Sequence, residues 1–310
     1  MNHSLFDLHC DTPYEMLRCG QSLTRNSLAV SLEKAAIFKH YVQIMAHWTN
    51  HRLSDEEGWD TLRAMHGNLL ADPAVRDGRV QIATAYPQEL PDRPRLLLAL
   101  EDARVLAGKP ERVDILFDMG FRILTPLWAG NTCIGGSHNT SDGLTAFGRA
   151  ALCRALELGM LLDISHASVP SAAEICALSQ EYERPYLATH SNAYKLCPVS
   201  RNLRQEQIMA LIASKGLIGL NLYQGFINAS GSASYVDLIP HIEYFLELGA
   251  SDCLCIGGDM DGCDLPPDLT DIAMLPRLGE ALLQRNYSED LVHKLFFANA
   301  HAFAARHLRT

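Results

Sequence analysis

Short apolar segments alternate along this chain with longer segments in which apolar residues recur at helical spacing. Several of the short segments are apolar throughout, which is typical of strands that are covered on both faces. Eight of them are predicted as strands: Leu5–His9, Tyr41–Ala46, Leu96–Glu101, Arg122–Thr125, Met160–Ser165, Tyr186–His190, Leu217–Leu222 and Leu254–Gly258.

The segments between these strands predict helices. Three of them, Ala146–Leu158, Leu203–Ser214 and Tyr235–Leu248, are followed within two residues by a glycine, the residue that most often follows the last turn of a helix. Glu56–Leu70 and Ser288–His307 show the same helical periodicity. Because strands and helices alternate, we expect a parallel sheet with crossover helices.

Eight strands favour a closed (β/α)₈ TIM-like barrel that occupies residues 1–310 as a single domain, since the chain has no linker, repeat or low-complexity run. The segment Val80–Thr84 is either a ninth strand or a hairpin insert. The alternative is an open doubly wound sheet, which normally has a glycine-rich turn after its first strand. Here the first strand runs into His9-Cys10-Asp11-Thr12-Pro13, which has no glycine.

Composition narrows the class of protein only a little. The formal net charge of −10 disfavours a nucleic-acid partner, which needs a basic surface. The sequence has no run of about 20 apolar residues that could cross a membrane, and its start lacks the pattern of a signal peptide. Its nine cysteines, an odd number without a CxxC pair, are typical of reduced thiols. We therefore expect a cytoplasmic protein without membrane attachment.

Candidate chemistry gathers where the predicted strands end. In a (β/α)₈ barrel the active site lies at the carboxyl ends of the strands. Five of the eight strands deliver a metal-type ligand or a carboxylate to that rim, more than chance placement explains. These residues are His9 and Asp11, Glu101, His166, His190 and Asp259.

Each of these residues also has an ordinary interpretation. Alternate residues of a strand share a face, so His9 and Asp11 could hold one ion, or they could be a surface histidine beside a turn. Glu101 follows five apolar residues, where a carboxylate is costly unless it is paired or bound to metal. It could bridge two cations, or be the first exposed residue. His166 and His190 suit zinc, although either alone could be a buried histidine with satisfied hydrogen bonds.

Asp259 lies in the segment Gly257-Gly258-Asp259-Met260-Asp261-Gly262, whose glycines allow a sharp turn. Its carboxylate could accept a proton from metal-activated water and pass it to a leaving amine. A calcium loop of the EF-hand type is excluded by the position of Gly262, whereas a plain Asp-Gly turn at Asp261 stays open.

The ordered set of motifs resembles the renal (membrane) dipeptidase family of the amidohydrolase-like superfamily. The resemblance runs from about residue 7 to residue 262. The matching segments are Asp7–Thr12, Leu98–Glu101, Gly143–Gly148, Asp163–His166, Thr189–Ala193, Arg201-Asn202 and Gly257–Gly262.

This resemblance implies a zinc peptidase with two Zn²⁺ ions. Glu101 would bridge them, with His9 and Asp11 completing one site and His166 and His190 the other. It implies that Asp259 handles protons, that Arg201 meets the carboxylate of the substrate, and that Tyr223 lies near the substrate. Trp128 occupies the place where many members have a histidine. Unlike histidine, tryptophan exchanges no proton near neutral pH.

The leading hypothesis is therefore a metallodipeptidase for small dipeptides, including those with a C-terminal D-residue. A second hypothesis is a zinc hydrolase of another amide or lactam, or of a secondary metabolite, with Trp128 shaping a different pocket. A third is a binding protein that keeps the barrel without catalysis. A homodimer is also implied by the family resemblance.

Overall fold

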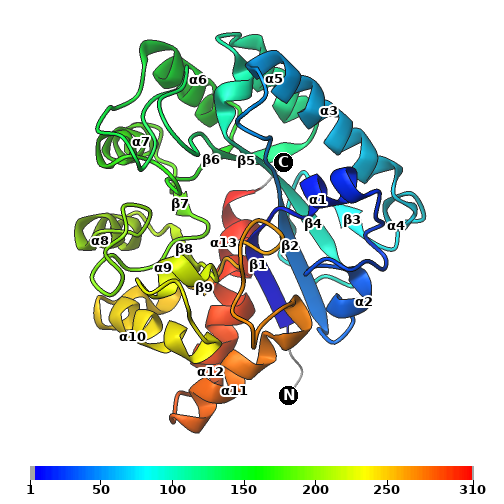
Figure 1. Ribbon diagram of the computed structural model, residues 1–310, viewed down its shortest axis with the longest axis vertical. Coiled ribbons are helices and arrows are strands. Elements are labelled where there is room, and N and C mark those ends of the chain that lie inside the picture. The colour runs from blue at the N-terminus through cyan, green and yellow to red at the C-terminus, as the bar shows by residue number, and fades with distance from the viewer. Residues whose placement is uncertain (1–3, 309–310) are drawn as a thin grey trace.

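Eight parallel strands form the inner layer of the protein (Figure 1). The computed structural model describes residues 4–308. The strands follow one another around the sheet in the order β6-β5-β4-β2-β1-β9-β8-β7. Their bounds are Ser4–Cys10 (β1), His40–His47 (β2), Arg95–Glu101 (β4), Phe121–Thr125 (β5), Leu161–Leu162 (β6), Leu187–Ala188 (β7), Leu217–Leu220 (β8) and Leu254–Ile256 (β9).

The sheet closes on itself between β6 and β7, its two shortest barrel strands. A parallel bridge pairs Asp163 with Leu187, and the N–H of Ile164 donates to the carbonyl of Leu187 at 2.8 Å. The predicted barrel is thereby confirmed in nearly closed form, and the open doubly wound sheet is wrong. Strand pairing around 160–165 and 186–190 is shorter than predicted because the backbone leaves the extended conformation, as the positive φ of His166 shows.

The segment around residue 81 is a ninth strand and no hairpin insert. β3 (Gln81–Ile82) runs parallel to the start of β4, with Gln81 opposite Arg95 and Ile82 opposite Leu96. β5 pairs with β4 only from Leu98 onward, so β3 extends the sheet below β5.

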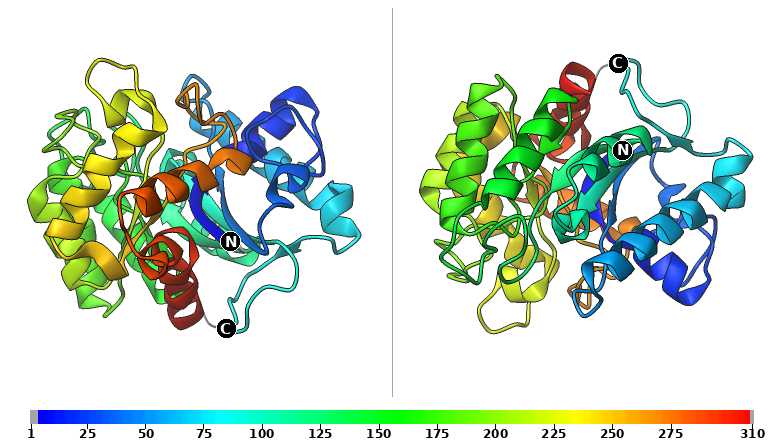
Figure 2. Two further views of the ribbon diagram at one scale, coloured as in Figure 1. Left: turned by 90° about the horizontal axis from the view of Figure 1, so that it is seen from below. Right: turned by 90° about the horizontal axis from the view of Figure 1, so that it is seen from above.

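Helices surround the barrel, and those from α6 to α10, green to yellow in Figure 2, cover one flank. The predicted helices correspond to α3 (Asp55–Ala71), α6 (Ala146–Glu157) and α8 (Gln205–Ala213). The prediction for 235–248 divides into a 3₁₀ turn, η2 (Tyr235–Leu238), and α10 (Ile239–Glu247), since α10 has a proline in its first turn. The last prediction divides into α12 (Glu289–His293), the π-helical turn η5 (Lys294–Ala298) and α13 (Asn299–His307).

The remaining helical segments are short or were not predicted. They are α1 (Thr12–Cys19), α2 (Leu32–Ala35), α4 (Pro73–Arg76), η1 (Ala103–Leu106), α5 (Glu111–Asp118), α7 (Val169–Glu181), α9 (Gln224–Ile227), η3 (Ala250–Asp252), η4 (Ile272–Met274) and α11 (Pro276–Gln284). Within residues 4–308, no helix has both the length and the apolar character needed to cross a bilayer.

Two glycines let the last barrel strands approach closely. A Cβ atom on Gly219 or on Gly257 would lie 1.8 Å from the carbonyl oxygen of Thr189. Any larger residue at either position would push β8 or the end of β9 away from β7. This close packing fixes the backbone of Thr189, and with it the position of the next residue, His190.

Candidate active site

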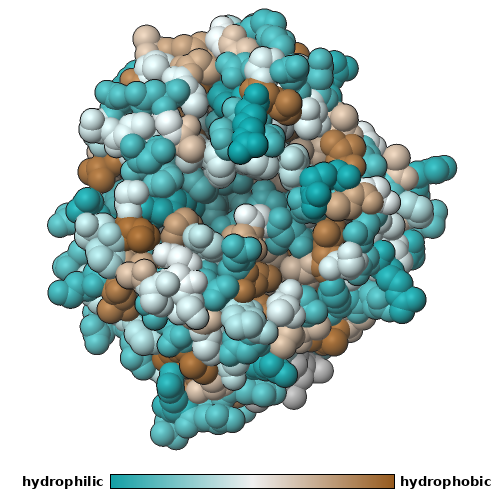
Figure 3. Space-filling model, in the orientation of Figure 1, coloured by the Kyte–Doolittle hydropathy of each residue, from teal (hydrophilic) through white to brown (hydrophobic). Residues whose placement is uncertain are grey.

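A cavity of about 520 Å³ lies at the carboxyl ends of the strands. Figure 3 shows a hollow near the middle of the face that Figure 1 presents, with mainly hydrophilic residues in view. The lining residues come from the segments that follow seven different strands. They are Asp11, Tyr14, Glu15, Trp48, Glu101, Trp128, His166, Tyr223, Phe226, Asp259, Asp261, Gly262, Cys263 and Asp264.

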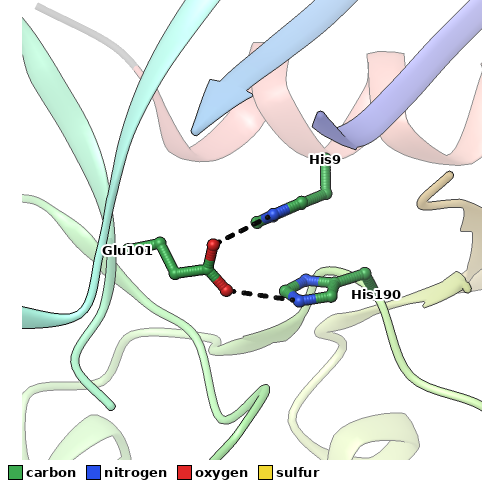
Figure 4. Close-up of side chains that lie close together, drawn as sticks. All are labelled: His9, Glu101 and His190. Carbon is green, nitrogen blue, oxygen red and sulfur yellow. Dashed lines mark ion pairs between the residues drawn. The ribbon is translucent and has the colours of Figure 1, made fainter. Parts of the chain in front are cut away.

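Glu101 lies at the centre of the polar groups, at the end of β4. Its Oε2 is 3.4 Å from Nε2 of His9, and its Oε1 is 3.0 Å from Nε2 of His166 and 3.5 Å from Nε2 of His190. Figure 4 shows the carboxylate between His9 and His190, with one oxygen directed at each ring. Both histidines and Glu101 are buried. One carboxylate thus faces two separate groups of nitrogen ligands.

A second cluster joins His9 to the carboxylates that follow β1 and β9. Nε2 of His9 is 3.5 Å from Oδ2 of Asp11 and 3.9 Å from Oδ1 of Asp259. The single-residue spacing between His9 and Asp11 therefore brings both side chains to one place, as the alternation of a strand predicts. The structure gathers all six strand-end residues that the sequence singled out.

The hydrogen bonds of His166 and His190 fix which ring nitrogen carries the proton. Nδ1 of His166 lies 3.1 Å from the carbonyl oxygen of Trp128, which can only accept, so Nδ1 donates. Nδ1 of His190 lies 2.8 Å from Oγ1 of Thr189, whose own proton goes to Oδ2 of Asp163 at 2.5 Å. Both Nε2 atoms then present lone pairs, although they are only 3.0 Å apart. Two facing lone pairs repel each other unless a cation lies beside them.

Asp163 holds this arrangement from beneath. Its fully buried carboxylate accepts hydrogen bonds from Oγ1 of Thr125 at 2.7 Å, the N–H of Ser165 at 2.9 Å and the N–H of Thr189 at 3.0 Å, in addition to the bond from the Thr189 hydroxyl. Through these bonds it connects the ends of β5, β6 and β7. Asp163 therefore positions the segments that carry both histidines.

The electrostatics also indicate a place for a cation. Burial, together with the negative charge of Glu101, raises the pKa of Asp11 to about 8. Burial opposes ionisation of Glu101 as well, but the positive charge of His9 outweighs it and holds the pKa of Glu101 well below the usual range. Both ring nitrogens of His9 and Oδ1 of Asp11 are buried without a hydrogen-bond partner among residues 4–308. Imidazole nitrogens and carboxylate oxygens are ligands that suit zinc, so this donor set fits a metal centre.

Asp259 is held rigidly at the edge of the cavity. Its backbone has a φ of 56°, in the left-handed region, and its Oδ2 accepts a hydrogen bond from Nδ2 of Asn221 at 2.9 Å. Burial raises its pKa, the charge of His9 lowers it, and Glu101 raises it again. A carboxylate with a raised pKa can hold a proton for part of a reaction cycle.

The three predicted substrate contacts differ in their placement. Trp128 and Tyr223 line the cavity. Arg201 does not, and only 4% of its surface is exposed. Its guanidinium lies next to the metal-type ligands, with Nη1 donating to Oγ of Ser191 at 2.8 Å and Nη2 donating to the carbonyl of His190 at 3.0 Å.

Sequence reasoning missed several residues of this site. Tyr14, Trp48 and Phe226 line the cavity, and Asn221 orients Asp259. Trp48 directly follows β2, so the rule that located the ligands at strand ends also indicates Trp48 once aromatic residues are included. Asn221 follows β8 in the same way, whereas nothing in the sequence distinguishes Tyr14 or Phe226 from other aromatic residues.

Comparison with known proteins identifies the family of this chain. Residues 1–303 match the model of the membrane dipeptidase family, peptidase family M19. The chain belongs to this family. The predicted resemblance is thus confirmed, and so is the prediction that the protein is an enzyme of the dipeptidase class of hydrolases.

The individual relatives share between 21% and 31% of their residues with this chain. An uncharacterized protein from the pqqA 5′ region of Klebsiella pneumoniae is 31% identical over 212 residues, which cover 64% of this chain and 77% of that protein. The structure of dipeptidase AC, a metallopeptidase of family M19, has a TM-score of 0.89 at 22% identity and covers 100% of both chains. A Rhodobacter sphaeroides metallopeptidase, bound to a phosphinate mimic of L-Ala-D-Ala, has a TM-score of 0.89 at 21% identity and covers 99% of this chain and 100% of its own. At these identities the two structures establish the fold.

Proposed function

We propose that the protein is a binuclear zinc dipeptidase that hydrolyses the peptide bond of small dipeptides. The observation that carries the proposal is the convergence of three histidines and three carboxylates, from the ends of five strands, around Glu101 at the cavity. Membership of the dipeptidase family supports the reaction class.

Glu101 would be shared between two Zn²⁺ ions, because each of its oxygens faces a different histidine group. His9 and Asp11 would complete one site, and His166 and His190 the other. Bound zinc supplies a Lewis acid for the scissile carbonyl and lowers the pKa of water.

Asp259 is the proposed proton carrier. Its Oδ2 is held by Asn221, which leaves Oδ1 to take a proton from the attacking water. As the C–N bond breaks, the same oxygen returns that proton to the leaving nitrogen, so the carboxylate ends in its starting state. The raised pKa of Asp259 helps it to keep the proton between the two transfers.

Arg201 is the proposed partner of the C-terminal carboxylate of the substrate. Its Nη atoms each keep a second N–H beyond the bonds to Ser191 and His190, and its Nε has no acceptor among the described residues. Tyr223, at the edge of α9, offers a hydroxyl from the cavity lining, and Trp128 offers its indole ring.

Dipeptides with a C-terminal D-residue belong to the proposal because the Rhodobacter enzyme binds a mimic of L-Ala-D-Ala. A cytoplasmic location and a homodimer also remain proposals. The second candidate is a hydrolase of another amide or lactam, which Trp128 favours because no histidine stands there to help hold a dipeptide oxyanion.

The test combines metal analysis with hydrolysis of L-Ala-L-Ala, L-Ala-D-Ala and N-acetyl-L-Ala-D-Ala. We expect two zinc ions per chain, zinc-dependent cleavage of a free dipeptide, and loss of turnover in Asp259→Asn with both ions retained. Protein that holds two zinc ions but cleaves no dipeptide contradicts the dipeptidase proposal and favours the second candidate. Protein that takes up no zinc contradicts the metal centre itself.

A further inference from the structure

Three aromatic side chains form a continuous surface on the cavity lining, here called the aromatic wall: Tyr14, Trp48 and Trp128. The ring of Tyr14 meets the ring of Trp48 edge to face, with centroids 5.1 Å apart and an interplanar angle of 79°. The rings of Trp48 and Trp128 follow at 5.1 Å and 57°. All three residues line the cavity, and each is only partly buried.

The wall is supported from outside the cavity. The exposed ring of His51 stacks on Trp128 at 5.0 Å with an interplanar angle of 30°. Among residues 4–308, no cation–π contact involves these three rings. Their exposed faces are therefore free apolar surface in a cavity that is also lined by six carboxylates. A ligand that covers these faces gains the free energy of removing them from water.

The wall directly adjoins the metal-type ligands. The ring centroid of Trp128 lies 6.2 Å from that of His166, and its carbonyl oxygen contacts Nδ1 of the same histidine. Tyr14 is on α1, which begins immediately after Asp11. A group bound against the wall is therefore next to the place where the peptide bond is cleaved, as a side chain of a dipeptide must be.

The charged residues of the lining disfavour a substrate with an acidic side chain. Among residues 4–308, no lysine or arginine lines the cavity, whereas six carboxylates do: Asp11, Glu15, Glu101, Asp259, Asp261 and Asp264. Both oxygens of Asp261 already accept hydrogen bonds from Thr12 and Ala29, so that group is structural. An acidic side chain would therefore find no lysine or arginine partner on the lining, while a neutral ring meets complementary aromatic surface.

We infer that the enzyme selects dipeptides that carry a large aromatic side chain, which packs against Tyr14, Trp48 and Trp128. The inference rests on the proposed dipeptidase function and specifies its substrate class. Two further aromatic residues of the cavity, Tyr223 and Phe226, pack edge to face at 4.7 Å and extend the apolar lining. An alanine side chain leaves most of a 520 Å³ cavity without contacts, whereas a phenyl ring fills part of it and meets the wall edge to face.

The first test compares kcat/KM for Phe-Ala and Ala-Phe with that for Ala-Ala and Ala-Glu. We expect at least one phenylalanine substrate to exceed Ala-Ala by about 10-fold or more, and Ala-Glu to be the poorest. Trp48→Ala should lower the ratio of the phenylalanine substrate to Ala-Ala by about 10-fold, and Trp48→Phe should restore most of it. Trp59→Phe is the matched control, because Trp59 is buried on α3 beneath Arg112 and does not line the cavity.

The second test measures binding without turnover. The chain has three tryptophans, and two of them are in the wall, so intrinsic fluorescence of Asp259→Asn reports on the cavity. The phenylalanine dipeptide should quench this emission more strongly than Ala-Ala does. The same difference should persist after Trp59→Phe, because the remaining emission then comes from Trp48 and Trp128 of the wall.

The outcomes separate the two proposals. Equal kcat/KM for Ala-Ala and both phenylalanine substrates, with no change of the ratio in Trp48→Ala, overturns the aromatic selection and leaves the dipeptidase standing. Absence of cleavage of every dipeptide by zinc-loaded protein overturns both. A Trp48→Ala protein that fails to fold is recognised by its thermal unfolding curve. In that event the fluorescence titration of the protein with Trp59→Phe decides, because quenching by the phenylalanine dipeptide no stronger than quenching by Ala-Ala overturns the inference.

Discussion

The hydroxyl of Thr189 connects a buried carboxylate to a candidate zinc ligand, so replacing Thr189 by valine should affect stability and metal affinity together. Valine has the same branched shape and keeps the packing at β7. It removes the atom that donates to Asp163 at 2.5 Å and accepts from His190 at 2.8 Å. After the change, Oδ2 of Asp163 keeps only the hydroxyl of Thr125, and Nδ1 of His190 loses its acceptor.

The size of the effect follows from these two losses. A hydrogen bond to a charged group contributes about 1.5–3 kcal/mol, and a buried N–H left without a partner costs about 1–3 kcal/mol. Burying a methyl in place of the hydroxyl recovers part of this, so we expect Thr189→Val to lower the free energy of unfolding by about 3 kcal/mol. Since His190 also loses the contact that fixes its tautomer, zinc affinity should fall by about 10–100-fold.

The assay is urea unfolding of zinc-free protein, combined with a zinc competition titration against a chromophoric chelator. Thr189→Ser is the matched control, because serine keeps the hydroxyl and loses one methyl, which costs about 1 kcal/mol. The reasoning is refuted if valine and serine lose the same free energy of unfolding and both retain the zinc affinity of the original protein.

Three further predictions concern packing, pH and metal. Gly219→Ala should destabilise the fold by about 3 kcal/mol or more, since its Cβ would lie 1.8 Å from the carbonyl of Thr189; a urea midpoint equal to that of the parent would contradict this. Burial, helped by the nearby charge of His66, lowers the pKa of His47 from 6.5 to about 3, so the unfolded chain binds a proton there that the folded protein does not. The contribution of His47 to stability should be complete above pH 6.5 and fall by about 1.4 kcal/mol per pH unit below it, so that the stability difference between the parent and His47→Gln changes with this slope; parallel stability curves for the two proteins would sink the assignment. Chelation should lower Tm by about 10 °C and added zinc should restore it, whereas an unchanged Tm would argue against a metal that binds the folded state.

The sequence was sufficient for the fold and the main polar cluster because both depend on simple periodicities. Apolar runs bounded by helices predict parallel strands, and the strand ends then predict that His9 and Glu101 meet. The lengths of β6 and β7 were not predictable in this way, because beyond Leu162 the pairing is reduced to a single bridge at Asp163, and hydropathy gives no sign of this. The backbone of His166 has a positive φ, so the chain turns there, and the hydropathy pattern does not predict that turn.

Contacts that depend on side-chain direction also escaped prediction. Nothing in the sequence says that Thr189 bonds to both Asp163 and His190, since that depends on how three strand ends are staggered. Arg201 could be predicted only from the family resemblance, and its burial beneath the cavity lining depends on the loop after β7. Trp48 directly follows a predicted strand, as the candidate ligands do. An aromatic residue at a strand end is common in packing as well as in binding, so its position alone did not identify it as part of the site.

The short pairing between β6 and β7 has a consequence for how the barrel folds. The sheet grows outward from β1 in two directions, and its ends meet between strands that are neighbours along the chain. Asp163 and the N–H of Thr189 that it binds are 26 residues apart, whereas Asp7 on β1 and the N–H of Gly258 after β9 are 251 residues apart. Closing the longer loop costs about 2 kcal/mol more in chain entropy. The barrier to barrel closure should therefore lie at the pairing of β1 with β9. The junction of β6 and β7, beside His166 and His190, can separate and pair again without breaking the β1–β9 pairing.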